Sequence, residues 1–216
     1  MPLLRTSATL ARRERRALCD TAILVGSDAP TLCGGWTARD LVVHLLVRER
    51  HPLGALGIVV GPLAGLTERA TRRAGRADFP VLVERVRSPW PVPFGLAPLD
   101  ALANTAEMFV HHEDLRRGSA RWAPRALPRA DEDVLWRVLT VAGRALVRPA
   151  GVPVRVERAD AAGSATLVGG SGGPVVLTGR PSELLLFVYG RSQVRDVQVE
   201  GPDESVAALR AADLGL

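Results

Sequence analysis

All four histidines of the chain lie in two short stretches, and a carboxylate precedes the second stretch at helical spacing. His44 and His51 lie on or just after one predicted helix, whereas His111 and His112 lie on another. With about 100° of rotation per helical residue, Glu107 and His111 fall on one side of their helix, four residues apart. An imidazole and a carboxylate so placed can bind one metal ion together. His112 is turned away by the same rotation, so we expect His111 to be the ligand of the two.

A third ligand is expected from a facing helix. The neighbours of His44 are apolar: Leu41, Leu45 and Val47. The ring of His44 should therefore point into the interior of a helical bundle. Two imidazole nitrogens and one carboxylate oxygen suit zinc (Zn2+) or another divalent metal and leave a fourth position open, as in catalytic zinc sites. The order of these residues differs from the His-Glu-x-x-His motif of zinc proteases, so peptide hydrolysis is not implied.

The same residues also have simpler interpretations. A buried histidine with a hydrogen-bond partner is commoner than a metal ligand, and Glu107 with His111 can be an ordinary pair on a helix surface. Asp114 can orient a ligand histidine, or it can offset the charge of Arg48 or Arg117. Spacing alone therefore nominates the metal site and leaves these alternatives open.

Nearby polar residues are expected to have structural or surface roles. Thr37 and Asp40 form the pattern of a capping box at the start of the helix that carries the first histidine. His51 and His112 are predicted to be surface residues. Cys33 could approach the metal site, but we favour a structural role for it.

Helical periodicity and end signals predict the elements that position these residues. Six helical segments are expected: about 7–25, 37–50, two pieces within 53–87, about 99–117 and about 131–147. A proline-rich loop is expected over residues 89–98. Near residues 148–153, glycine, valine and period-two alternation take over. Strands are then expected at 152–157, 165–168, 175–178 and 194–199, with helices over 181–189 and from 202. The predicted fold class is α+β, with a helical bundle over 1–148 and a small α+β domain over 149–216.

The 216-residue chain, with 47% hydrophobic and 24% charged residues, has the composition of a globular protein. Its longest apolar stretch, residues 53–66, is interrupted by glycines and Pro62 and is shorter than the about 20 residues that a membrane span needs. The N-terminus does not resemble a secretory signal. We therefore expect a cytoplasmic protein without a membrane partner, in which Cys19 and Cys33 are free thiols.

The formal net charge is +5, and all basic residues that count toward it are arginines, since the sequence contains no lysine. The arginines are scattered, apart from a group over residues 12–16, and they do not interleave with aromatic residues as on a nucleic-acid stacking platform. We therefore expect no nucleic-acid partner. The composition suggests a GC-rich genome, which favours arginine codons.

Two runs of residues resemble a known family. Residues 35–45, Gly-Trp-Thr-Ala-Arg-Asp-Leu-Val-Val-His-Leu, are similar to a motif of the mycothiol-dependent maleylpyruvate isomerase family, Gly-Trp-Thr-x-x-Asp-Leu-x-x-His-Leu. Residues 107–114, Glu-Met-Phe-Val-His-His-Glu-Asp, resemble its second motif, Glu-x-x-x-His followed by an acid. The resemblance implies a DinB-like four-helix bundle whose metal ligands are His44, Glu107 and His111, the set that spacing nominates.

The resemblance extends to the C-terminal part of the chain. Residues 179–191 are similar to the helix segment of the family's C-terminal domain, which implies a sterol-carrier-protein-like α/β module. Arg191 is then the candidate for binding an anionic substrate, as a catalytic-site residue. It can equally be a residue at a helix C-terminus that faces the helix dipole.

The resemblance also implies a reaction. Mycothiol, an actinobacterial thiol, would be the cosubstrate of a transferase or a cis/trans isomerase that acts on a small electrophile. Both reactions are consistent with the resemblance, and no oligomeric state is implied. The alternative is a non-catalytic module that binds metal or thiol and serves as a sensor or regulator.

Overall fold

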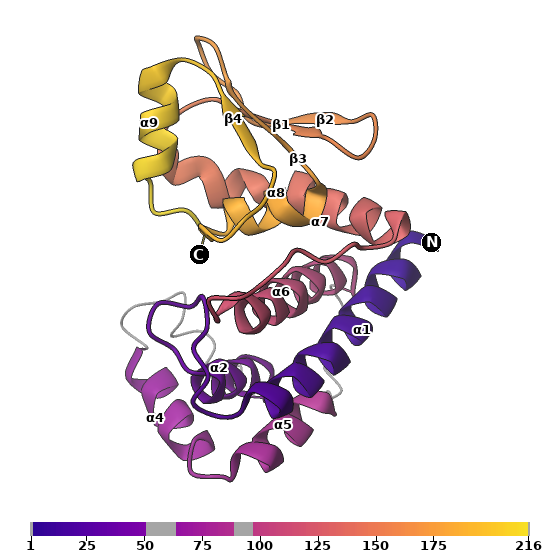
Figure 1. Cartoon of the computed structure of the whole chain (residues 1–216), viewed down its shortest axis with the longest axis vertical. Helices are drawn as coiled ribbons and strands as arrows, with labels where there is room; N and C mark the ends of the chain where they lie inside the picture. Colours follow the sequence, from indigo (N-terminus) through magenta and orange to yellow (C-terminus); the bar gives the residue numbers. More distant parts are fainter. Residues whose placement is uncertain (1, 51–63, 89–96, 216) are drawn as a thin grey trace. The chain divides into compact units, whose positions relative to one another are not determined.

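The computed structural model of the protein describes residues 2–50, 64–88 and 97–215 (Figure 1). His51 and most of the predicted proline-rich loop lie outside these residues. By its contacts the chain divides into two compact units. The helical unit comprises Ala11–Asp100 and Glu107–Ala123, and the sheet unit comprises Met1–Leu10, Ala101–Ala106 and Pro124–Leu216. No helix among the described residues is long and apolar enough to cross a membrane.

The helical unit is built from the predicted helices. They are α1 (Pro2–Val25), α2 (Ala38–Arg50), α4 (Ala64–Ala74), α5 (Phe79–Arg87) and α6 (Ala97–Arg117), of which α1 and α6 begin in the other unit. Residues of α1, α2, α5 and α6 share one apolar core, whose largest fully buried members include Leu18, Leu41, Leu45, Leu82 and Met108. Burial of each such side chain contributes about 1.5–3 kcal/mol. The core therefore confirms the predicted four-helix bundle.

The capping box at the start of α2 is present as predicted. The Thr37 backbone N–H donates to Asp40 Oδ2 at 2.9 Å, and the Asp40 backbone N–H donates to Thr37 Oγ1 at 3.3 Å. These bonds satisfy amides that the first turn of a helix leaves without partners. They fix where α2 begins, and hence which residues of α2 face α6.

The loop between α1 and α2 folds back onto the end of α6. The Leu32 backbone N–H donates to the Asp114 carbonyl at 3.2 Å, and Pro30 forms an isolated β-bridge with Thr37. Gly118, just after α6, has the carbonyl of Pro30 where a Cβ would lie. Only glycine allows this approach, so the loop is seated directly against the α6 terminus.

The sheet unit contains a mixed sheet of four strands in the order β2-β1-β3-β4. The strands are β1 (Val154–Arg158), β2 (Ser164–Val168), β3 (Val175–Gly179) and β4 (Gln198–Glu200). β1 and β2 are antiparallel neighbours, whereas β3 pairs with the other edge of β1 in parallel. The glycine-rich turn before β3 therefore does not join a hairpin, and β4 is shorter than the predicted strand over 194–199.

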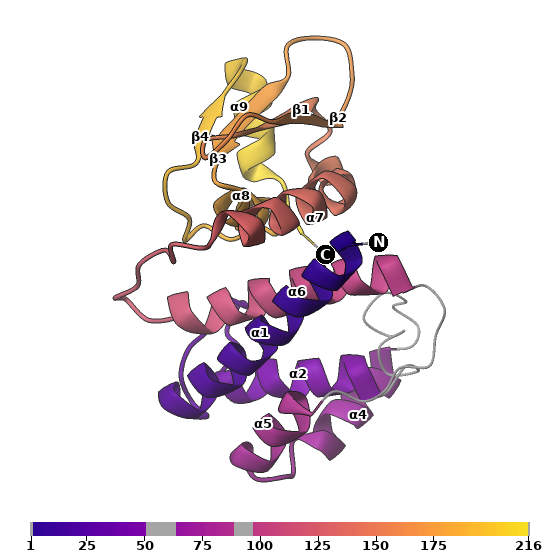
Figure 2. The same cartoon turned by 90° about the vertical axis from the view of Figure 1, so that its right-hand side faces the viewer.

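Helices complete the sheet unit (Figures 1 and 2). α7 (Arg129–Val147) packs against β2 and against α8 (Pro181–Val188), and α9 (Asp203–Ala211) packs against the short turn η2 (Arg148–Ala150). Glu132 of α7 accepts hydrogen bonds from the backbone N–H and the hydroxyl of Ser182, both at 2.9 Å. By its contacts, α7 thus belongs to the sheet unit. The boundary near residue 148, where composition changes, stays a prediction about domains.

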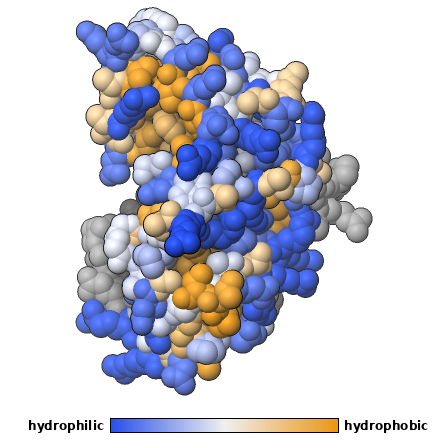
Figure 3. Space-filling model, in the orientation of Figure 1, coloured by the Kyte–Doolittle hydropathy of each residue, from blue (hydrophilic) through white to orange (hydrophobic). Residues whose placement is uncertain are grey.

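Many arginines are engaged with carboxylates of their own unit. Such pairs include Arg15 with Glu49, Arg87 with Asp20, Arg117 with Glu113 and Arg158 with Asp160. The face shown in Figure 3 alternates between hydrophilic and apolar areas. These ion pairs balance part of the arginine charge within each unit.

Replacement of Gly118 by alanine is predicted to destabilise the protein. The new Cβ would overlap the Pro30 carbonyl, a backbone group that cannot rotate away, at a cost of about 2–3 kcal/mol. Gly65→Ala is the matched control, because nothing lies within 4 Å of a Cβ there. Urea unfolding of both variants measures the difference. Equal stabilities would contradict the seating of the loop on α6.

Candidate metal centre

The three predicted ligands converge in the helical unit. His44 of α2 and His111 of α6 each place Nε2 3.3 Å from Oε1 of Glu107 on α6. The side chains of His44, Glu107 and His111 are 19%, 18% and 12% exposed, so the cluster is largely buried but reachable from solvent. One donor atom from each residue lies within 4.8 Å of the others.

Two of the three separations between these atoms match those expected around a tetrahedral metal ion. Ligands at about 2.0–2.1 Å from zinc lie about 3.3–3.4 Å apart, because a tetrahedron's edge is about 1.6 times its centre-to-corner distance. Glu107 Oε1 shows this separation from both histidine nitrogens. Two imidazoles and one carboxylate are also a donor set that zinc accepts. The residues present therefore fit a zinc ion with one coordination position left for another ligand.

A buried carboxylate orients His111. Nδ1 of the ring lies 2.9 Å from Asp114 Oδ2, and the Asp114 side chain is fully buried. Donation by Nδ1–H to this oxygen leaves the lone pair of a neutral ring on Nε2, which faces Glu107. Of the alternatives for Asp114, the structure supports the orienting one. Arg117 pairs with the buried Glu113.

Electrostatics around the cluster shift two pKa values in opposite directions. Burial acts to raise the pKa of Glu107, but hydrogen bonds from both histidines and the charge of Arg48 outweigh it and hold this pKa well below its usual range. Burial acts to lower the pKa of His111, but hydrogen bonds with Asp114, Cys33 and Glu107 outweigh it and hold this pKa well above its usual range. Without a metal ion, a protonated imidazole therefore balances the carboxylate.

A second group of donor atoms meets the other nitrogen of His111. Cys33 Sγ lies 3.0 Å from Asp114 Oδ2 and 3.7 Å from His111 Nδ1, and these three residues also have donor atoms within 4.8 Å of one another. Cys33 thus approaches the candidate ligands, which the sequence left open beside a structural role. Its sulfur belongs to the surroundings of the candidate ligands.

His112 corrects one of our predictions. It faces away from His111, as the helical rotation requires, yet it is only 4% exposed and is not a surface residue. Its Nδ1 lies 2.7 Å from Glu14 Oε2 and its Nε2 lies 3.1 Å from Thr21 Oγ1, both on α1. The prediction failed because α1 packs on this side of α6 and supplies Glu14 and Thr21 as polar partners for the ring.

Two further contacts at the site were not predicted. Arg48 Nε lies 3.3 Å from Glu107 Oε1, and the Trp36 ring lies 5.1 Å from the His44 ring, tilted by 50°. Arg48 follows His44 by four residues, so helical spacing could have placed both on the face toward Glu107. The contact of Trp36 depends on the loop before α2 and has no signal of this kind.

Arg191 lies in the sheet unit, just beyond α8. Its Nη1 donates to the carbonyl of Tyr189 at 2.6 Å, which is a contact expected of a basic residue at a helix C-terminus. A guanidinium has five N–H donors, so this bond is compatible with a second partner.

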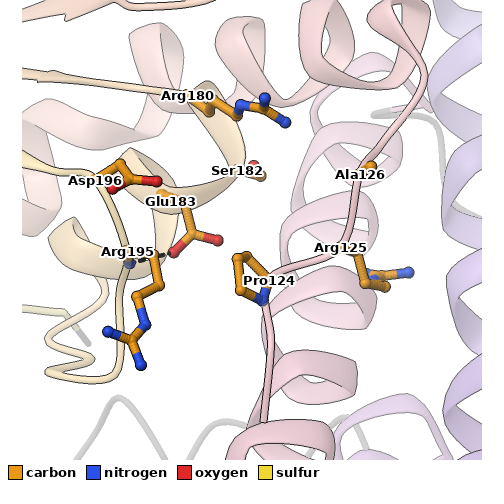
Figure 4. A pocket seen from close by; sticks show the side chains of 8 residues that line it. All are labelled: Pro124, Arg125, Ala126, Arg180, Ser182, Glu183, Arg195 and Asp196. Atoms are coloured by element: carbon orange, nitrogen blue, oxygen red, sulfur yellow. Dashed lines mark hydrogen bonds between the residues drawn. The ribbon is translucent and has the colours of Figure 1, made fainter.

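A cavity of about 170 Å³ also lies in the sheet unit (Figure 4). The residues that line it are Pro124, Arg125, Ala126, Arg180, Ser182, Glu183, Arg195 and Asp196. None of them is a candidate ligand. Glu183 at its wall accepts a hydrogen bond from the Arg195 backbone N–H at 2.8 Å. Sites for drug-sized ligands have about 300–1,000 Å³, so this cavity is too small to hold such a molecule.

Comparisons with known proteins establish the fold. No protein-family model and no curated protein matches the sequence. Two solved structures do: the crystal structure of the mycothiol-dependent maleylpyruvate isomerase, with a TM-score of 0.63, and that of a histidine-to-alanine variant of it, with a TM-score of 0.62. Each is 16% identical to this chain and covers 92% of it and 95% of its own length. The fold of this chain is that of the isomerase, which confirms the predicted α+β class and, at the level of fold, the resemblance seen in the sequence.

Removing the charge of Glu107 is predicted to weaken zinc binding. Glu107→Gln keeps the size of the side chain and should lower the affinity for zinc by at least about tenfold, since loss of even an outer-shell partner costs that much. Glu84→Gln on α5, whose side chain is 63% exposed, is the matched control. Competition with a chromophoric chelator measures both. Equal affinities, or a parent protein that binds no zinc, would refute the ligand assignment.

The effect of zinc on stability is predicted to grow with pH. Because its pKa is raised in the fold, protonated His111 stabilises the metal-free protein below about pH 6.5, and this stabilisation is lost as the pH rises through the raised value. Zinc requires the neutral ring and must displace that proton. The increase in Tm on adding zinc should therefore be larger at about pH 8 than at about pH 6. An increase that does not change over this range would contradict the prediction.

Proposed function

We propose that this protein is a zinc-dependent enzyme that uses mycothiol as cosubstrate, either a cis/trans isomerase or an S-transferase acting on a small electrophile. The observation that carries the proposal is the convergence of His44 Nε2 and His111 Nε2 on Glu107 Oε1, each at 3.3 Å, within a fold shared with the mycothiol-dependent maleylpyruvate isomerase. The same donor atoms in an unrelated bundle would indicate a metal but no thiol.

The charge of the donor set suits a thiol. One carboxylate and two neutral imidazoles leave a divalent ion with one net positive charge, so the fourth position favours a singly charged anion. When bound, zinc lowers the pKa of a coordinated thiol, which then reacts as its thiolate. His44 and His111 would hold the ion through their Nε2 atoms, which lie beside Glu107, and Asp114 keeps the His111 ring in the required tautomer.

The reaction follows one of two courses. A thiolate that adds reversibly to an activated double bond allows rotation before the bond reforms, which is isomerisation. A thiolate that displaces a leaving group gives a stable thioether, which is conjugation. The isomerase name of the solved structures with this fold favours the first course.

Arg191 is our candidate for binding the anionic group of the substrate, because its guanidinium can donate to a carboxylate as well as to the Tyr189 carbonyl.

Both courses of the reaction need a reduced thiol. The two cysteines of this chain are free, as is usual in the cytoplasm, where we place the protein.

Catalysis is tested with zinc-loaded protein, mycothiol and a panel of small electrophiles that includes cis-unsaturated acids and alkyl halides. We expect isomerisation or conjugation faster than with the thiol alone, and loss of most of this rate in His44→Ala. Glu84→Gln should keep the full rate. Tight zinc binding without any acceleration would refute the enzyme and favour the non-catalytic sensor.

A further inference from the structure

The sulfur of Cys33 and a ring nitrogen of His111 are hydrogen-bonded to the same oxygen atom. Asp114 Oδ2 lies 3.0 Å from Cys33 Sγ and 2.9 Å from His111 Nδ1. The aspartate side chain is fully buried, whereas the cysteine is half-buried. The three groups form a chain that ends at Nε2 of His111, the atom that faces Glu107.

The backbone around Cys33 is held on both sides. The Cys33 N–H donates to Thr31 Oγ1 at 3.1 Å, and the Trp36 N–H donates to the Cys33 carbonyl at 2.8 Å. The adjacent Leu32 N–H donates to the backbone carbonyl of Asp114. The loop thus meets this residue of α6 twice, once through its backbone and once through the sulfur.

The geometry defines what the sulfur does. An ionised carboxylate only accepts hydrogen bonds, so the sulfur that contacts Asp114 must carry a proton and donate it. A thiolate at this distance would place two negative charges in contact. Cys33 is therefore a thiol donor in this arrangement and not a nucleophile.

We propose that Cys33 is a positioning residue of the metal centre: its S–H holds the Asp114 carboxylate in the orientation that accepts Nδ1–H of His111, and so presents Nε2 of that ring to the metal. The proposal rests on the proposed metal site, but it is independent of mycothiol and of the reaction. It assigns a chemical reason to the cysteine that precedes the Gly-Trp-Thr run of this sequence.

The competing arrangement makes Cys33 itself a ligand. Its sulfur, His111 Nδ1 and an Asp114 oxygen are close enough to hold an ion. That arrangement requires the loss of both the thiol proton and the Nδ1 proton, and it would take His111 away from Glu107 or make the ring bridge two ions. The positioning role keeps both protons and uses His111 once.

Three cysteine variants and one spectrum test the proposal. Zinc alone is titrated into the parent protein, Cys33→Ala, Cys33→Ser and the control Cys19→Ala, which removes the buried thiol that contacts the Val83 carbonyl. We expect Cys33→Ala to bind zinc about threefold to tenfold more weakly, Cys33→Ser to restore most of the affinity through its hydroxyl donor, and Cys19→Ala to bind as the parent does. In the cobalt-substituted parent we expect no sulfur-to-cobalt charge-transfer band.

Each contrary result overturns the proposal in a distinct way. A charge-transfer band that disappears in Cys33→Ser would make Cys33 a ligand. Unchanged zinc affinity in Cys33→Ala would leave it without a role at the metal, even if the variant unfolds more readily. If the parent binds no zinc, the proposed function fails as well, whereas zinc binding that is insensitive to Cys33 refutes the present inference alone.

Discussion

The shared contact of Glu107 with two histidines is the interaction on which the rest of the centre depends. A carboxylate loses much hydration in a site that is 18% exposed, and this loss must be offset by positive charge nearby. Arg48 and protonated His111 supply that charge in the metal-free protein, which is why the two pKa values move apart. A divalent ion replaces the proton and supplies more charge at the same place. The arrangement would suit a cation, because part of the charge that compensates its carboxylate is a proton on His111, which a metal would displace.

The bundle holds this contact through features that act on helix register. The capping box fixes the start of α2 and thereby the rotation that turns His44 and Arg48 toward α6. On another side of α6, His112 bonds to Glu14 and Thr21 of α1. Since neighbouring residues of a helix point about 100° apart, fixing His112 also fixes His111. A buried polar network of this kind specifies one arrangement of the helices more than it adds stability.

Much of the fold and of the ligand set could be predicted from the sequence because both rest on short-range periodicity. Helical spacing locates α2, α6 and α7 to within a few residues, and four-residue separation pairs Glu107 with His111. The burial of His112 could not be read in this way, because the partners that cover it, Glu14 and Thr21, lie on α1 and are far from it in the sequence. Nor could the position of Cys33, which meets Asp114 across 81 residues of sequence. The parallel pairing of β1 with β3 likewise follows from how the chain crosses the unit and not from the turn before β3.

His111 shows why the centre needs a histidine and its oriented partner together. Imidazole is the side chain that can give one nitrogen to a metal and use the other, on the far side of the same rigid ring, as a hydrogen-bond donor. In the proposed metal site Asp114 would therefore act on the ion through the ring, and a group that holds Asp114 would act through both. Glutamate or cysteine at position 111 would supply a ligand atom but no second group that donates a hydrogen bond to Asp114. The loop before α2 therefore meets the candidate ligands in two places, through Cys33 and Asp114 at His111 and through Trp36 at His44, which makes the α6 terminus and this loop part of the candidate centre.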